Sequence, residues 1–192
     1  MIAARSSQAL KEWAITIEFL KTGRQILLLR KGGIHEQRDG FRVEYKECFL
    51  LPTYLHENLH DLHPMTHLEF ERLEAEKPSG NVIRFDTYAQ INETIWVTNA
   101  EALRRLDGLH TLNWEAVERR FHYRSRPGLH LVLLRIYRLT TPHLVENQPE
   151  YDGCVSWVDL RDALPTRGAE PVLSPAEFEA QASDVRKLVN CE

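Results

Sequence analysis

The sequence lacks several features that mark particular classes of protein. Its three cysteines, Cys48, Cys154 and Cys191, are odd in number and widely spaced, so they form neither a CxxC pair nor a disulfide framework. No run approaches the roughly 18 apolar residues of a membrane-spanning helix. The first residues contain no apolar segment of the kind that a secretory signal needs. These absences predict a cytoplasmic protein with reduced thiols and no membrane partner.

Basic charge is also scarce. The chain has 24 lysines and arginines against 28 aspartates and glutamates, and its formal net charge is −4. The molecule as a whole therefore has no positive field for nucleic acid, and any anion site must be a local patch. With 192 residues, 43% of them apolar, the chain suits one domain with a proper core. We predict a single α+β domain over residues 1–165, and a linker and C-terminal helix over residues 166–192, packed on it or appended to it.

The order of strand and helix signals predicts the fold class. Alternating apolar residues over 13–19 are typical of a strand with one buried face, and the wholly apolar residues 26–29 suit a central strand. Further strands are expected at residues 41–51, 82–87, 94–97, 129–139 and 154–160. Helices are expected at residues 54–62, 67–75, 100–108, 114–123 and from 175 onwards, most of them behind capping residues. Because hairpins outnumber βαβ units, we expect a mixed, largely antiparallel sheet or a partly closed barrel, flanked by short helices.

The segment His56-Glu57-Asn58-Leu59-His60 matches the HExxH pattern. On a helix this spacing puts two imidazoles on one face for zinc, with the glutamate as general base. The expected helix is short, however, and Pro64 interrupts it before His67. We therefore favour a polar, histidine-rich surface helix. Zinc held by His56 and His60 is the alternative, and we do not expect Zn²⁺ as a cofactor.

Glu44 and Lys46 form a second candidate pair. Residues i and i+2 share one face of a strand, so a carboxylate and an ammonium project together. Nucleases of the PD-(D/E)xK type use such a pair with an upstream acid, which Glu36 or Asp39 could supply, to hold Mg²⁺ and activate water. The alternative is an ion-paired, solvated strand face. The nuclease hypothesis implies Mg²⁺ as its cofactor, and the other hypotheses leave the cofactor open.

Two basic segments are candidates for contact with an anion. Arg30, Lys31, Gly32 and Gly33 combine two cations with exposed backbone N–H groups, although a sharp bend after a buried strand explains the same residues. Residues 119–126 interleave aromatic rings with four arginines, Arg119, Arg120, Arg124 and Arg126. Arginine pairs with phosphates and stacks on bases. Cations also favour a helix C-terminus without any ligand, so this cluster has a structural explanation too.

Several separated segments are similar to one known family. They are residues 9–14, residues 26–34, residues 49–54 with His56, and the C-terminal stretches 137–139 and 151–158. Together they resemble the uncharacterised bacterial proteins grouped as domain of unknown function 1802. The resemblance brings no established activity. The motif residues that it places nearest a pocket are Arg30, Lys31, Gly32, Gly33, Glu36, Thr53, Tyr54 and His56.

These observations rank three functions. The leading hypothesis is a protein that binds a phosphate-bearing ligand, foremost nucleic acid, through Arg30–Gly33 and residues 119–126, with Tyr54 and His56 lining the site. The first alternative is the Mg²⁺-dependent nuclease built on Glu44 and Lys46. The second is a non-catalytic protein-interaction domain that docks through its C-terminal helix.

Overall fold

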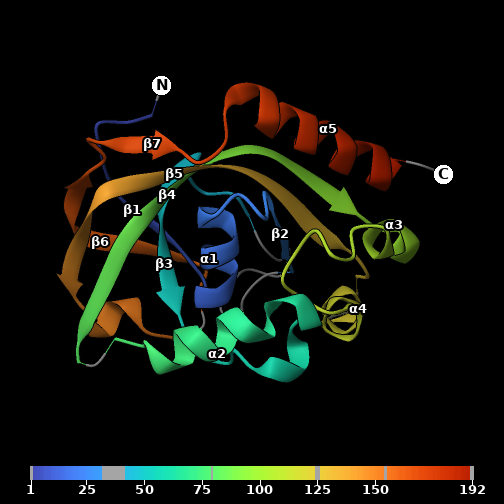
Figure 1. Ribbon diagram of the computed structural model, residues 1–192, viewed down its shortest axis with the longest axis horizontal. Coiled ribbons are helices and arrows are strands. Elements are labelled where there is room, and N and C mark those ends of the chain that lie inside the picture. The colour runs from blue at the N-terminus through green and yellow to red at the C-terminus, as the bar shows by residue number, and fades with distance from the viewer. Residues whose placement is uncertain (1, 32–41, 79, 124–125, 154, 191–192) are drawn as a thin grey trace.

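The computed structural model describes residues 2–31, 42–78, 80–123, 126–153 and 155–190. Within these residues seven strands form one sheet in the order β2-β5-β4-β3-β1-β6, and β7 pairs with a further part of β5 (Figure 1). Only β1 and β3 run parallel, and every other pair is antiparallel. The strands are β1 (Arg5–Trp13), β2 (Leu27–Arg30), β3 (Glu47–Thr53), β4 (Val82–Val97), β5 (Leu129–Glu146), β6 (Trp157–Pro165) and β7 (Ala169–Pro171).

The predicted fold class is confirmed. The sheet is mixed and largely antiparallel, and helices flank it on both faces. The sheet does not close into a barrel, because β2 and β6 end it without pairing to each other. The helices are α1 (Ala14–Lys21), α2 (His67–Ala75), α3 (Ala100–Arg104), α4 (Trp114–His122) and α5 (Pro175–Asn190), with short 3-10 turns at Leu59–Asp61, Pro64–Thr66 and Pro149–Tyr151. None of these described helices is both long and apolar enough to span a bilayer.

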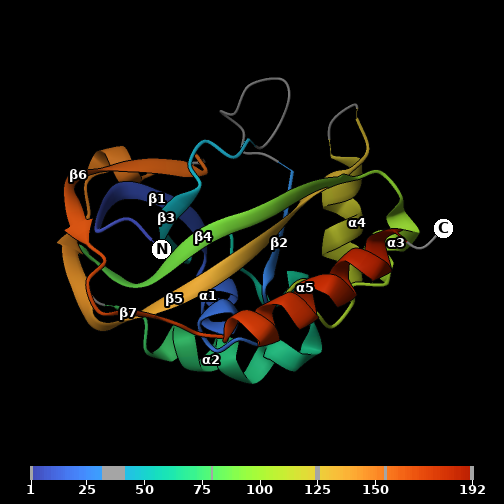
Figure 2. The same cartoon turned by 90° about the horizontal axis from the view of Figure 1, so that it is seen from above.

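The long pair β4 and β5 carries most of the sheet, and side chains alternate between its two faces. Leu131 and Leu133 of β5 pack into a core cluster with α3, α4 and α5, whereas Val132 and Leu134 pack on the opposite face against α1. Figure 2 shows α5 running beside β5. Complete burial of one such aliphatic side chain stabilises the fold by about 1.5–3 kcal/mol. Two irregularities in the pairing, at 85–87 and 91–93, allow so long a pair to bend.

Local capping signals locate most helix starts correctly. The Asn99 side chain accepts the N–H of Glu101 at the start of α3, and that of Asn113 accepts the N–H of Ala116 in α4. At α5 a full capping box forms, because Ser174 and Glu177 each accept the other's backbone N–H. The predicted bounds of α2 are confirmed, although the Thr66 hydroxyl donates to the His63 carbonyl instead of capping the helix.

Residues 14–19 form no strand, and Trp13 is the last residue of β1, which corrects the prediction of a strand over 13–19. Residues 14–21 are helix α1, and six of its eight residues are buried. A helix that is apolar on nearly every side shows no 3.6-residue period, so its sequence can imitate a strand. The true first strand, β1, is rich in polar residues but lies inside the sheet between β3 and β6.

Four further expectations are corrected. β2 ends the sheet instead of occupying its centre, and it is apolar on both faces because core clusters cover both. The strand expected at 41–51 begins only at Glu47, and residues 42–46 are irregular. The helix expected at 54–62 is a series of turns with one 3-10 turn. The two strands expected at 82–87 and 94–97 are one continuous strand.

Residues 166–190 lie against the rest of the chain. β7 pairs with β5, and α5 buries Phe178, Ala182 and Val185 in the cluster that also contains β2. The apolar side chains of α5 are therefore engaged within the chain itself, which counts against their use as a docking surface.

The Gly128→Ala substitution should destabilise the protein strongly. Gly128 has φ +139°, and a Cβ added there would lie 2.4 Å from the Trp96 ring, so overpacking of about 1–3 kcal/mol is expected. Gly108→Ala is the control, because Gly108 also has positive φ but its added Cβ would meet nothing within 4 Å. Urea unfolding compares the two variants, and equal losses of stability would contradict the proposed clash.

Candidate functional site

A cleft of about 310 Å³ lies where the ends of β1 and β2 approach α4. We call it the arginine cleft. Its wall includes Glu12, Trp13, Arg30, His56, Arg120 and Ser156. Residues that are far apart in the sequence thus meet in one hollow, and four of its lining residues, Arg30, Lys31, His56 and Arg120, belong to the predicted binding set.

Arg30 is fixed in this wall by hydrogen bonds. Its guanidinium donates to a Glu12 carboxylate oxygen at 2.8 Å, to the Ser156 hydroxyl at 2.5 Å and to the Lys11 carbonyl at 3.3 Å. The Arg30 and Glu12 side chains are only 16% and 10% exposed. Ion pairs that are this well shielded need all their partners, because a single remaining charge would be poorly solvated. Arg30 therefore shapes the cleft, and Glu12 offsets its charge.

Arg120 has a different environment. It is half-buried on α4 with its guanidinium 4.8 Å from the centre of the Trp13 ring. It makes no hydrogen bond or ion pair to any described residue. Burial lowers the pKa of this guanidinium, the nearby Glu12 opposes that effect, and Arg30 reinforces it. Guanidinium carries five N–H donors, so an anion in the cleft would satisfy groups that the protein leaves unmatched.

The other predicted cations are engaged elsewhere. The Lys31 ammonium donates to the carbonyls of Phe121, Arg126 and Gly128, at 2.9, 2.6 and 2.8 Å, which fastens the end of α4 to the start of β5. Arg119 is 58% exposed and pairs with Asp61, and the Arg126 guanidinium lies over the Trp96 ring. Of the described arginines in residues 119–126, only Arg120 lines the cleft. Gly32, Gly33, Glu36, Asp39 and Arg124 lie outside the described residues.

The predicted zinc geometry at His56 and His60 does not form. His56 has a positive φ of 61° and lies in a turn on the wall of the cleft, whereas His60 belongs to the separate 3-10 turn. The helix prediction failed because Glu57 is directed toward α1, where its carboxylate accepts the Ile15 N–H at 2.9 Å. In the described part of the chain, no three His, Cys, Asp or Glu side chains gather as a metal site.

Glu57 thus caps the N-terminus of helix α1, and it is not placed as the general base of a zinc site. Burial raises the pKa of its carboxyl to about 7, and the hydrogen bond from Ile15 opposes that shift. Glu74 and Glu12 add to the increase, and Lys77 reduces it.

The predicted nuclease pair also lacks its expected geometry. Glu44 and Lys46 lie outside any strand, are exposed and line neither of the hollows described here. Between them, Tyr45 packs edge-on against Trp157 with ring centres 5.4 Å apart. This packing holds the segment across β6 instead of extending β3.

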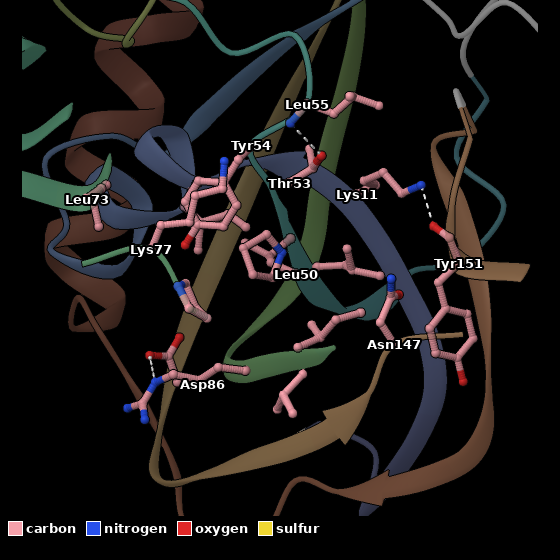
Figure 3. Close-up of a pocket in the computed structure, with 18 of the residues that line it drawn as sticks. Lys11, Leu50, Thr53, Tyr54, Leu55, Leu73, Lys77, Asp86, Asn147 and Tyr151 are labelled. Carbon is pink, nitrogen blue, oxygen red and sulfur yellow. Dashed lines mark hydrogen bonds and ion pairs between the residues drawn. The ribbon is translucent and has the colours of Figure 1, made fainter. Parts of the chain in front are cut away.

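A larger hollow of about 730 Å³, which no motif predicted, adjoins the arginine cleft (Figure 3). We call it the large hollow. Tyr54 lines it instead of the arginine cleft, and the Lys77 ammonium lies 4.6 Å from the centre of the Tyr54 ring. Its rim cations have acidic partners: Lys21 pairs with Glu18 and Asp86, Arg72 with Glu18 and Glu76, and Arg84 with Asp86. The rim therefore carries little unbalanced charge.

Four residues, Lys11, Thr53, Leu55 and Gly153, line both hollows. The Lys11 ammonium is held at this boundary, because it donates to the carbonyls of Tyr151 at 2.6 Å and Gly153 at 2.9 Å (Figure 3). The Thr53 hydroxyl accepts the Leu55 N–H and shapes the turn after β3. The family resemblance marked this place through Thr53 and Tyr54, and β3 continues through Pro52 to Thr53.

These features define an α+β protein with an open mixed sheet and a cationic cleft at one edge. The family model described as a domain of unknown function (DUF1802) matches residues 9–184, so the chain belongs to that family. The resemblance predicted from the sequence is therefore confirmed. Comparisons with curated proteins and with solved structures gave no match.

Glu57→Gln should become progressively more stabilising, relative to the parent, as pH rises. The folded carboxyl titrates near pH 7 and the unfolded one near its usual 4.5, so the parent loses stability as pH rises between these values. Glutamine keeps an acceptor for the Ile15 N–H and does not titrate. Melting temperatures from pH 5 to 8 measure the effect. Glu71→Gln, at an exposed position of α2, controls for the loss of one negative charge. The same pH trend in both variants would contradict the assignment to Glu57.

His110 should give the stability of the protein the opposite dependence on pH. Its ring is 3% exposed, and neither ring nitrogen has a hydrogen-bond partner in the described structure. Burial lowers its pKa from 6.5 to about 4, with Asp107 opposing the shift. The parent should therefore lose stability as pH falls from 6.5 to 4, and His110→Phe should lose less. Melting curves at several pH values test this, with His122→Phe, at an exposed position of α4, as the control. Parallel pH curves for parent and His110→Phe would contradict it.

Proposed function

We propose that the arginine cleft binds a phosphate-bearing ligand and that Arg120 is the principal contact. The observation that carries this proposal is the Arg120 guanidinium, which is half-buried on the wall of the cleft and has no hydrogen-bond partner among the described residues. The described structure supplies no acceptor for these N–H donors, and an anion in the cleft would form charge-assisted hydrogen bonds with them.

The local charge supports phosphate over a singly charged anion. Among the described residues, four cationic side chains, Lys11, Arg30, Lys31 and Arg120, line the cleft with a single carboxylate, Glu12. The ammonium groups of the two lysines donate to backbone carbonyls. An excess of cationic over acidic side chains among these described lining residues favours a dianion, in a protein whose net charge is −4.

The size of the cleft bears on the kind of ligand. About 310 Å³ suits one phosphate group and its immediate ester, which is the scale of a small-molecule site. Arg119 and Arg126 of the same segment are directed to Asp61 and Trp96. We therefore propose that the cleft recognises a single phosphate group, either on a small molecule or at the end of a nucleic-acid strand. It does not form a groove that follows a nucleic-acid backbone.

Titration with inorganic phosphate, followed by phosphorus NMR at low salt, tests this function. Arg120→Gln should weaken binding by about tenfold or more, because it removes the charged fork. Arg119→Gln is the matched control on the adjacent residue and should change affinity little. Arg120→Lys keeps the charge but not the fork, so its affinity should lie between those of the parent and Arg120→Gln.

Two outcomes would overturn the proposal. One is a parent protein that binds no phosphate at low ionic strength. The other is equal weakening by Arg119→Gln and Arg120→Gln. A short single-stranded oligonucleotide with and without a terminal phosphate completes the series, and Arg120 should matter only for the phosphorylated strand.

A further inference from the structure

We infer that the arginine cleft and the large hollow are one two-part site for a nucleoside monophosphate. The phosphate lies against Arg120 and the nucleoside occupies the large hollow. This inference rests on the proposed function and extends it by naming the body of the ligand.

The first support is adjacency. Lys11, Thr53, Leu55 and Gly153 contribute to the walls of both hollows, so the two spaces lie next to each other at the turn that follows β3. The Lys11 ammonium is drawn aside to two carbonyls on the Tyr151 side of the hollow (Figure 3). A phosphate ester bound at Arg120 therefore has a space beside it for its organic group.

The second support is the balance of charge. The arginine cleft has excess positive charge, whereas the cations on the rim of the large hollow are matched by Glu18, Glu76 and Asp86. The inner wall of the large hollow includes Ile17, Leu50 and Leu73. A rim whose charges are paired, above an apolar wall, suits the uncharged part of a ligand. The two spaces together thus match a molecule that is anionic at one end only.

The third support is the polar chemistry of the large hollow, which favours a nucleoside over an acyl chain. Tyr54 is half-buried, and its hydroxyl has no hydrogen-bond partner among the described residues. Burial raises the pKa of this hydroxyl, so it stays a donor at neutral pH. Asn147 lies on the opposite side of the hollow (Figure 3). Flat aromatic and amide groups facing one space match a ring with hydrogen-bonding edges.

The test compares inorganic phosphate, the four common ribonucleoside monophosphates and dodecyl phosphate by phosphorus NMR titration. At least one nucleotide should bind the parent about tenfold more tightly than phosphate. Leu73→Trp fills the large hollow and should abolish this advantage while phosphate affinity stays unchanged. Leu68→Trp is the control, because Leu68 is 77% exposed on the same helix and does not line the hollow.

Tyr54→Phe is a second, milder variant in case Leu73→Trp does not fold. Loss of one hydrogen bond should weaken the nucleotide by about threefold to tenfold and leave phosphate affinity unchanged. Arg120→Gln should weaken both ligands.

The results separate the two proposals. If phosphate binds through Arg120 but no nucleotide binds more tightly, or only dodecyl phosphate does, the two-part nucleotide site is wrong and the proposed function stands. If nucleotides bind more tightly than phosphate but Leu73→Trp and Tyr54→Phe do not reduce this advantage, the nucleoside lies outside the large hollow. The inference is then also wrong. If neither phosphate nor nucleotide binds, both proposals fail.

Discussion

The ion pair between Arg30 and Glu12 connects regions near opposite ends of the open sheet. Arg30 ends β2, the first strand of the sheet order, whereas Glu12 lies on β1 and Ser156 directly precedes β6, at the other end. One guanidinium therefore spans a gap that a closed barrel would fill with a backbone ladder. Because the gap is bridged by side chains, it leaves a cleft, and the shielded charges in its wall hold one another in place.

The unsatisfied hydrogen-bond donors of Arg120 follow from this arrangement. Glu12 is the one carboxylate among the described residues of the cleft wall, and it accepts hydrogen bonds from Arg30 and from the backbone N–H of Trp13. Trp13 in turn offers its ring to Arg120, which shields that cation from water without neutralising it. Arg120 is thus left with positive charge and unused donors because its neighbours are satisfied by one another. The compensated rim of the large hollow shows the opposite pattern in the same molecule.

Signals confined to a few residues predicted the structure well, and those that depend on distant partners did not. Caps at Asn99, Asn113 and Ser174 located three helix starts because a cap bonds within its own turn. The strand expected at 13–19 failed because a helix buried on most sides leaves no amphipathic period. In the basic segment 119–126, the sequence marked several arginines equally. Only the positions of Asp61, Trp96 and Trp13 decide which of them lines the cleft. The large hollow is lined by residues of β1, β3, α2 and β4, and only the tertiary fold brings these elements together, so no local pattern could reveal it.

The position of β1 has a consequence for synthesis on the ribosome. This N-terminal strand is flanked by β3 on one side and by β6 on the other, and β6 begins only at Trp157. A nascent chain therefore carries one unprotected edge of β1 until β6 has emerged from the exit tunnel. Pairing between such remote segments is slow to nucleate. An exposed strand edge also invites association with other chains, so the growing polypeptide has a long interval in which chaperone protection matters.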